Sequence, residues 1–194
     1  MCIRDRLKEW LEKGNEKVLL TREPGGTPLG NQLRDILLDN KTGVISPRAE
    51  ALMYAADRAH HVFSIIRPAL ERGEVVISDR YFDSSIAYQG AGRVLLPTEV
   101  ARISRWATES LTPTLTVIMD LPAEIGLARL QSTDRLESEP LAFHERVRHE
   151  FLNLAYQDPE RFLVIDASLE IDQIHQLITE RVGLIKALKR NQKI

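Results

Sequence analysis

The chain has 194 residues, of which 43% are apolar, and this size and composition are typical of a single globular domain. Because 26 Lys and Arg residues are balanced by 28 Asp and Glu residues, the formal charge is −2, and no excess of positive charge is available to bind a nucleic-acid polymer or an anionic membrane. The single cysteine, the charged start of the chain and the lack of a long apolar segment favour a cytoplasmic protein without a membrane span.

The first part of the chain alternates between helical and strand-like patterns. Residues 7–13 have apolar positions at helical spacing and are followed by Gly14, so we expect the chain to open inside an amphipathic helix. The apolar run at 18–20 predicts a buried strand that leads into a turn-rich loop at 21–26. Helical spacing returns over residues 29–38. This order of elements is typical of an α/β protein.

A long helix and a second buried strand follow. Ser46 and Pro47 form an N-cap and a first-turn proline, and the apolar pattern after them predicts the longest helix, which ends near Gly73. Residues 75–78 are apolar on both faces, as is typical of a strand in a helix-covered parallel sheet. The segment Asp79-Arg80-Tyr81 comes directly after this strand. We therefore expect it at the carboxyl-terminal edge of the sheet.

The remaining elements continue the alternation. After a loop containing Gly90 and Gly92, we expect a helix at 98–111, a strand at 115–119, helices at 123–130 and 140–156, a strand at 162–165 and a terminal helix at 172–189. Alternating strands and helices favour right-handed crossovers and a parallel sheet with helices on both faces. The sequence therefore predicts one α/β domain that spans residues 1–194.

Two of the predicted strands end in segments that can carry chemistry. In open parallel sheets ligands bind beyond the carboxyl ends of the strands, so residues 21–26 and 79–81 are expected to face one crevice. An aspartate at such a strand end can hold a hydrated magnesium ion, and an adjacent arginine can bind a phosphate through two hydrogen bonds. Asp79 and Arg80 take these roles in the functional interpretation. An ion pair that only connects two loops explains the same residues equally well.

Further candidate binding residues lie on the long helix and after the second strand. Tyr54 and Arg58 are one helical turn apart, so a ring that can stack on a base and a guanidinium that can reach its polar edge project from one face. A tyrosine at this spacing is also typical of a hydrophobic core. The segment after Tyr81 supplies polar groups to a pocket or forms an ordinary loop, and its candidates are Ser84, Ser85, Tyr88, Gln89, Gly90, Gly92 and Arg93.

The histidines do not indicate a metal site. His60 and His61 are adjacent and therefore point in different directions on a helix. His144 and His149 are five residues apart, not at the spacing of three or four that places two metal ligands on one helical face. The sequence therefore predicts no cluster of histidine ligands.

Several segments together resemble the thymidylate kinase family, the nucleoside monophosphate kinases that phosphorylate thymidine monophosphate (dTMP) with ATP. The matching motifs, in the family's order, are Thr-Arg-Glu-Pro-Gly-Gly-Thr at 21–27, Ala-Ala-Asp-Arg at 55–58, Asp-Arg-Tyr at 79–81, Ala-Tyr-Gln-Gly at 87–90 and Asp-Arg-Leu-Glu at 134–137. The resemblance implies a P-loop NTPase-like three-layer fold and the synthesis of dTDP from dTMP with ATP and Mg²⁺. It also implies a homodimer whose interface uses long helices such as residues 46–72.

The resemblance also implies roles for individual residues. Tyr54 is similar to the family residue that stacks on thymine, and Arg58 to the donor to the carbonyl edge of the base. Arg80 would bind the substrate phosphate, and Asp79 would be the carboxylate beside the magnesium site. The other implied positions are Glu23 and Pro24, which line the crevice, Ser85, Tyr88 and Gln89, which select a deoxyribose pyrimidine, and Arg129 and Arg135, which lie in a short lid at about residues 126–140 that closes over ATP.

The sequence departs from the family pattern at its start. The family begins with a strand and the phosphate-binding loop G-x-x-x-x-G-K-S/T, whereas residues 25–30 keep only the glycine spacing and continue as Asn-Gln. We therefore expect the first central strand, between 75–78 and 115–119, and the phosphate loop to be missing, with the kinase activity impaired. The alternatives are a non-catalytic nucleotide-binding or dimerisation remnant and, less consistent with Asp-Arg-Tyr, a deoxynucleoside kinase.

Overall fold

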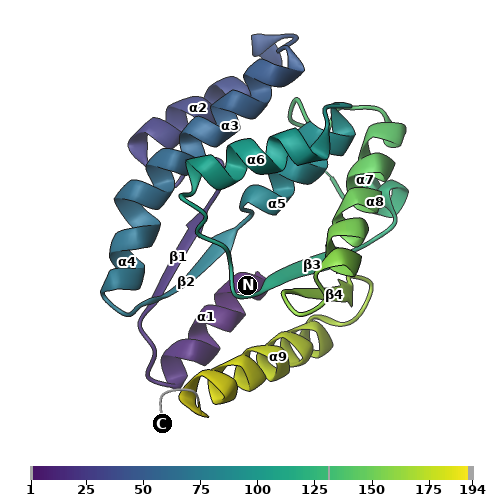
Figure 1. The fold of residues 1–194 in the computed structure, drawn as a ribbon. Coiled ribbons are helices and arrows are strands. Elements are labelled where there is room, and N and C mark those ends of the chain that lie inside the picture. The colour runs from purple at the N-terminus through teal and green to yellow at the C-terminus, as the bar shows by residue number, and fades with distance from the viewer. Residues whose placement is uncertain (1, 131, 192–194) are drawn as a thin grey trace.

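The computed structural model describes residues 2–130 and 132–191, in which parallel strands are flanked by helices (Figure 1). The strands are β1 (Val18–Arg22), β2 (Val75–Asp79), β3 (Thr116–Asp120) and β4 (Phe162–Asp166). The α-helices are α1 (Ile3–Lys13), α2 (Pro28–Leu38), α3 (Pro47–His61), α4 (Arg67–Glu71), α5 (Phe82–Ser85), α6 (Pro97–Ala107), α7 (Ala123–Ala128), α8 (Leu141–Gln157) and α9 (Ile171–Asn191). Shorter helical turns are η1 (Asn40–Thr42), η2 (Val62–Ile66) and η3 (Ile86–Gly92). In these described ranges, no helix is long and apolar enough to cross a membrane.

The strands form two separate parallel pairs. β1 pairs with β2 from Val18 opposite Val75 onward, and β3 pairs with β4 from Thr116 opposite Phe162 onward. Within the described part of the chain, β2 and β3 are not hydrogen-bonded to each other, so each strand has one free edge. This gap lies where the first central strand is expected to be missing from the sequence. Figure 1 shows the two pairs apart, with helices around them.

The helix starts follow the capping residues in the sequence. The Thr27 hydroxyl accepts a hydrogen bond from the Gly30 amide at 2.8 Å, and the Ser46 hydroxyl accepts one from the Ala49 amide at 3.4 Å. In both cases the next residue is a proline, whose fixed φ suits the first turn of a helix. The expected long helix is confirmed as the continuous helical segment α3, η2 and α4.

Two sequence expectations are wrong in detail. The segment with Gly90 and Gly92, expected as a loop, is helical in α5 and η3. A Cβ atom on Gly90 would lie 3.1 Å from Pro97, and one on Gly92 would lie 2.7 Å from Phe143, so these glycines permit close packing within a helix and do not break it. The next helix, α6, ends at Ala107 and not near 111, because the backbone reverses at Glu109 and Ser110, which both have positive φ.

Three hydrophobic clusters hold the elements together. On one side of the strands, α1 and α9 lie together, and Ile165 of β4 packs on Ile174 and Ile178 of α9 (Figure 1). A second cluster joins β3 and β4 to α8. The third contains Leu37, Tyr54, Ala87, Leu136, Phe143 and Val147 and joins α2, α3, η3 and α8. This third, helical cluster forms one wall of the candidate site.

Candidate functional site

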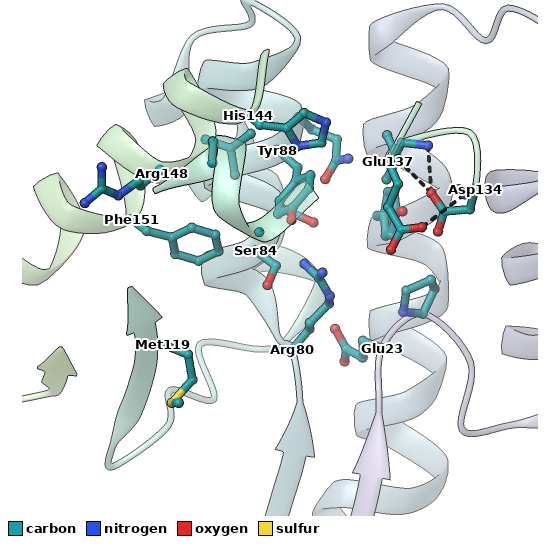
Figure 2. A pocket seen from close by; sticks show the side chains of 18 of the residues that line it. Glu23, Arg80, Ser84, Tyr88, Met119, Asp134, Glu137, His144, Arg148 and Phe151 are labelled. Atoms are coloured by element: carbon teal, nitrogen blue, oxygen red, sulfur yellow. Dashed lines mark hydrogen bonds between the residues drawn. The ribbon is translucent and has the colours of Figure 1, made fainter. Parts of the chain in front are cut away.

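A cavity of about 380 Å³ lies at the carboxyl ends of β1, β2 and β3. This is where open parallel sheets bind ligands, and the volume is within the range of roughly 300 to 1,000 Å³ that is usual for small-molecule sites. The lining contains all the substrate-binding residues predicted from the sequence, namely Glu23, Pro24, Tyr54, Arg58, Arg80, Ser85, Tyr88 and Gln89. Figure 2 shows Glu23, Arg80 and Tyr88 on one side and Met119 of β3 on the other. The cavity therefore spans both strand pairs.

The loop after β1 forms one wall of the cavity. The Glu23 amide donates to the Asp79 carbonyl at 2.9 Å, which joins the ends of β1 and β2. Gly25 and Gly26 have φ values of 104° and 98°, a region that glycine adopts readily, and the chain turns back there. On the other side of the loop, Arg34 Nη1 of α2 donates to the Pro24 carbonyl at 3.0 Å. The loop is thus held from two sides, which fixes Glu23 and Pro24 at the cavity.

The Glu23 carboxylate is buried and bound by two side chains of α3. Arg58 Nε donates to Glu23 Oε2 at 2.7 Å, and His61 Nδ1 donates to Oε1 at 3.0 Å. Arg58 Nη2 also donates to the Ser85 hydroxyl at 3.1 Å. A buried charge is tolerated when it is paired and hydrogen-bonded, and both conditions are met here. Three predicted site residues, Glu23, Arg58 and Ser85, therefore form one polar cluster.

Asp57 contacts the same loop without a charge partner of its own. Its Oδ1 accepts a hydrogen bond from the Gly25 amide at 3.3 Å, and its buried Oδ2 has no hydrogen-bond partner among the described residues. Burial, together with the nearby charge of Glu23, raises the pKa of Asp57 from 3.8 to about 6. Folding therefore extends the pH range in which this carboxyl group is mostly protonated to about pH 6.

We expect Asp57→Asn to stabilise the protein increasingly as the pH rises from 4 to 7. Because the pKa of Asp57 is raised on folding, the stability that protonation contributes is complete below 3.8 and is lost as the pH rises through about 6. Asparagine has a similar shape and stays neutral, so its advantage should grow by on the order of 1 to 2 kcal/mol over this range. Urea denaturation of both proteins at pH 4 and pH 7 measures this. A difference that does not change with pH would contradict the assignment.

Tyr54 belongs both to the core and to the cavity wall. The residue is buried in the cluster with Leu37 and Phe143, and it also lines the cavity. Burial raises the pKa of the Tyr54 phenol, which therefore stays protonated at neutral pH. The two sequence interpretations, a core tyrosine and a base-stacking tyrosine, are both compatible with this position.

Arg80 extends from the end of β2 into the cavity (Figure 2). Its φ of 66° is left-handed, a conformation that costs a residue other than glycine about 1 to 2 kcal/mol. The guanidinium carbon lies 4.9 Å from the centroid of the Tyr88 ring, within the range of a cation–π contact, and Tyr88 packs edge-on against Phe143 and Phe151. Among the described residues, no ion pair neutralises Arg80. Its positive charge is available to an anionic ligand.

Asp79 lies at the end of β2 but does not line the cavity. Its exposed carboxylate contacts the guanidinium of Arg4 in α1. The described ranges contain no group of three or more His, Cys, Asp or Glu residues that could hold a metal ion. A single carboxylate still fits Mg²⁺ that is bound mainly by nucleotide phosphates and water, since such sites use one or two carboxylates. The Arg4 contact would have to open for Asp79 to take that role.

The two predicted lid arginines do not line the cavity in this structure. Arg135 Nε donates to the Leu37 carbonyl at 2.7 Å, and a terminal nitrogen of the same guanidinium contacts the buried Glu50 carboxylate. Arg129 follows α7 and is exposed. Residue 131 of the predicted lid at 126–140 lies outside the described residues. The role of Arg135 toward ATP stays a prediction, and it requires the contact with Glu50 to open.

Sequence reasoning missed several residues that shape the site. Arg148 of α8 binds Asp120 through two hydrogen bonds of 2.7 and 2.9 Å at the end of β3, and both residues line the cavity. The position of Asp120 at a strand end, like that of Asp79, was the signal that could have found it. Glu50 and His61 carried no such signal, because their partners lie far away in the sequence. From the sequence alone, His61 is a candidate only for a metal site, and its spacing does not support that role.

The chain is similar to thymidylate kinases over most of its length. A family profile described as "Thymidylate kinase" matches residues 2–178. The chain is 53% identical to the thymidylate kinase of Clavibacter sepedonicus over 185 residues, which are 93% of this chain and 87% of that protein. It is 56% identical to the thymidylate kinase of Leifsonia xyli subsp. xyli, with 87% and 81% covered, and 51% identical to that of Bifidobacterium longum subsp. infantis, with 90% and 76% covered.

Proposed function

Because the chain belongs to the thymidylate kinase family of ATP-dependent phosphotransferases, we propose that the cavity at the ends of β1, β2 and β3 binds dTMP and presents its phosphate to ATP. The observation that carries the proposal is that every predicted substrate-binding residue lines this one cavity. These residues come from four separate stretches of the sequence. Their convergence supports a shared ligand.

In the proposed mode of binding, the chain contributes position and charge. Tyr54 stacks on the thymine, and Arg58, whose side chain is held by Glu23, donates to the carbonyl edge of the base. Arg80 binds the phosphate, and Ser85, Tyr88 and Gln89 surround the deoxyribose. A phosphate oxygen of dTMP then attacks the terminal phosphorus of ATP, the bond to the ADP oxygen breaks, and dTDP and ADP result. Positioning and charge stabilisation account for most of the catalysis in such transfers.

The predicted metal and lid residues are part of the same proposal. Asp79 would help to hold Mg²⁺ beside the phosphates, and the ion would neutralise the charge of the transferred group. Arg129 and Arg135, in a lid at about residues 126–140 of the single domain, would approach ATP when the lid closes. We also propose that the protein acts in the cytoplasm.

We further propose that this chain of 194 residues binds dTMP better than ATP and has impaired kinase activity. The predicted substrate-binding residues all line the cavity, whereas no segment of the sequence has the pattern G-x-x-x-x-G-K-S/T that binds the ATP phosphates. A non-catalytic nucleotide-binding protein is the alternative that this same observation favours. Turnover in a coupled assay distinguishes the two, because the alternative predicts none.

Titration calorimetry with dTMP and with Mg-ATP tests the proposed site. We expect dTMP to bind more tightly, and Arg80→Ala to weaken its binding by about 1.5 to 3 kcal/mol, the contribution of a hydrogen bond to a charged group. Arg22→Ala is the matched control, because this arginine comes from the neighbouring strand but does not line the cavity. Tight binding of Mg-ATP without binding of dTMP, or an Arg80→Ala variant with unchanged dTMP affinity, would contradict the proposal.

A homodimer is the proposed assembly, supported by an apolar stripe on the long helix. Leu52 and Phe63 are eleven residues apart, about three helical turns, and therefore lie on one face, where Phe63 is 75% exposed. Trp106 on the adjacent α6 is 82% exposed. Large exposed apolar side chains on two adjacent helices favour an interface, and a twofold dimer would cover these side chains on both copies.

We expect the protein to sediment as a dimer at tens of micromolar and Phe63→Glu to shift it to a monomer, because the charge would be buried at the interface without a partner. Tyr156→Glu is the matched control, since Tyr156 is 87% exposed on α8, away from the stripe. Analytical ultracentrifugation measures the change. If wild type and Phe63→Glu have the same mass, the interface is elsewhere or absent.

A further inference from the structure

We propose that His61 is a positioning residue that, through Glu23, sets the orientation in which Arg58 meets the base of a bound pyrimidine nucleotide. This inference rests on the proposed function of the cavity, and it adds a residue that does not line the cavity itself. The observation behind it is a continuous path of buried hydrogen bonds from Thr21 through His61 and Glu23 to Arg58.

The His61 ring is fixed at both of its nitrogens. Nδ1 donates to Glu23 Oε1 at 3.0 Å, and Nε2 lies 2.6 Å from the Thr21 hydroxyl, from which it can accept a hydrogen bond. The side chain is fully buried, so water does not compete for either nitrogen. An imidazole with two short contacts and no solvent has one orientation, and it transmits the position of β1 to the Glu23 carboxylate.

The Glu23 carboxylate in turn holds the side of Arg58 that faces away from a ligand. Glu23 binds Nε, Ser85 binds Nη2 at 3.1 Å, and Ser104 accepts from Nη1 at 3.5 Å. A guanidinium has five N–H donors in one rigid plane, so these three contacts leave two donors without a partner among the described residues. Arg58 is only 2% exposed but lines the cavity. Its free donors are therefore presented to a ligand in one fixed geometry.

The glycine loop gives independent support, because it closes directly over the His61 contact. Gly26 has a φ of 98°, and a Cβ atom there would lie 2.9 Å from the Thr21 hydroxyl oxygen and 3.1 Å from His61 Nε2. Only glycine fits this space without a shift of His61 or Thr21. The loop that carries Glu23 and Pro24 into the cavity is thus packed on the histidine that orients Glu23.

Removing the His61 contact should leave Arg58 in the cavity wall but should change the orientation of its guanidinium. Without Nδ1, Glu23 keeps its bond to Arg58 through Oε2, but one of the two contacts that fix its carboxylate plane is lost. The guanidinium then presents its free donors less accurately. The affinity should therefore fall for ligands that accept hydrogen bonds from these donors, and the affinity for other nucleotides should change less.

The test compares dTMP with deoxycytidine monophosphate, which has an amino donor where dTMP has a carbonyl acceptor. Two variants of the full chain form a matched pair. In His61→Asn the amide nitrogen takes the place of Nδ1 and keeps the bond to Glu23. In His61→Gln the amide oxygen takes the place of Nε2 and still accepts from the Thr21 hydroxyl, whereas the bond to Glu23 is lost.

We expect His61→Gln to raise the dTMP dissociation constant about tenfold in titration calorimetry while that of deoxycytidine monophosphate changes less than about threefold. His61→Asn should keep most of the wild-type preference for dTMP. Adding His61→Gln to Arg58→Met should cause no further loss, because both act on one interaction. Thermal unfolding of each variant shows whether the change in dTMP affinity results from a general loss of folding stability. Equal effects of the two variants, or an additive double variant, would overturn the inference.

The outcomes also separate this inference from the proposed function. If the wild type shows no preference for dTMP, both fail. If Arg58→Met abolishes the preference and His61→Gln does not, only the role of His61 is wrong. If neither His61 variant folds, Thr21→Val replaces them, since it releases the other ring nitrogen without a change at Glu23. A smaller fall in the preference is then expected, and an unchanged preference would overturn the inference.

Discussion

Replacing Glu50 with alanine is expected to destabilise the protein by about 3 to 5 kcal/mol, the usual effect of removing one partner from a buried ion pair. The Glu50 carboxylate is fully buried, accepts from Arg93 Nε and Gln89 Nε2 at 3.1 Å each, and contacts Arg135. The substitution would leave two guanidinium groups without this carboxylate. Urea denaturation of the variant measures the loss.

The contribution of Glu50 to folding stability also depends on pH, and its direction follows from the shift of the Glu50 pKa. Burial raises the pKa of Glu50, but the hydrogen bonds from Arg93, Arg135 and Gln89 outweigh this effect and lower it below the ordinary value of 4.5. The stability that the ionised carboxylate contributes is therefore present above pH 4.5 and is lost as the pH falls below it.

The matched control for Glu50→Ala is Glu139→Ala, which removes a more exposed partner of Arg93 and should cost less than about 1 kcal/mol. Equal losses for the two variants would show that Glu50 is not the centre of the network.

The second large effect is expected at the free edges of β2 and β3. A version of the protein with an added strand and glycine-rich phosphate loop between these edges should gain folding stability and ATP binding together. Each buried backbone group left without a partner costs about 1 to 3 kcal/mol, against a total domain stability of about 5 to 15 kcal/mol. Several backbone groups of this kind, if left unpaired at the edges of β2 and β3, would together cost as much as the stability of the whole fold. Without the strand we expect a broad melting transition and association of the chains through these edges.

Amide hydrogen exchange in β2 and β3, together with ATP titration, measures the two gains. The matched control carries the added strand with the lysine of the loop replaced by alanine, which should recover amide protection without ATP binding. Kinase turnover should rise about 100-fold or more only in the version with the intact loop. A sharp melt and full amide protection of Val75 to Ser78 in the printed chain would show that the sheet closes in another way.

The sequence predicts the alternating strands and helices and the grouping of the candidate residues at one cavity, for physical reasons. Buried parallel strands and capped amphipathic helices have short-range patterns, so β2 and the continuous helical segment of α3, η2 and α4 are found within a residue or two. The meeting of residues 21–26 and 79–81 follows from one topological rule, the convergence of strand ends. The helical conformation of residues 82–92 is missed because glycine normally ends a helix, whereas Gly92 is needed to admit Phe143 from α8.

The long-range side-chain contacts are beyond the reach of sequence patterns. Arg135 matches a family motif, but its contact with Glu50 joins positions 85 residues apart, and no periodicity indicates it. His61 is similar, since its partners Thr21 and Glu23 lie on another element. Such pairs form only once the helices are packed, so their chemistry becomes visible only in the folded structure.

The left-handed backbone at Arg80 favours glycine for stability, whereas the cavity at the same position contains the arginine side chain. Glycine would adopt the φ of 66° without strain, and in an engineering programme guided by melting temperature alone it would be the favoured substitution. That change would also remove the guanidinium that faces the cavity beside Tyr88. Thermostabilised versions of this protein should therefore be sought at other positions, because glycine at residue 80 would remove the side chain that we propose binds the substrate phosphate.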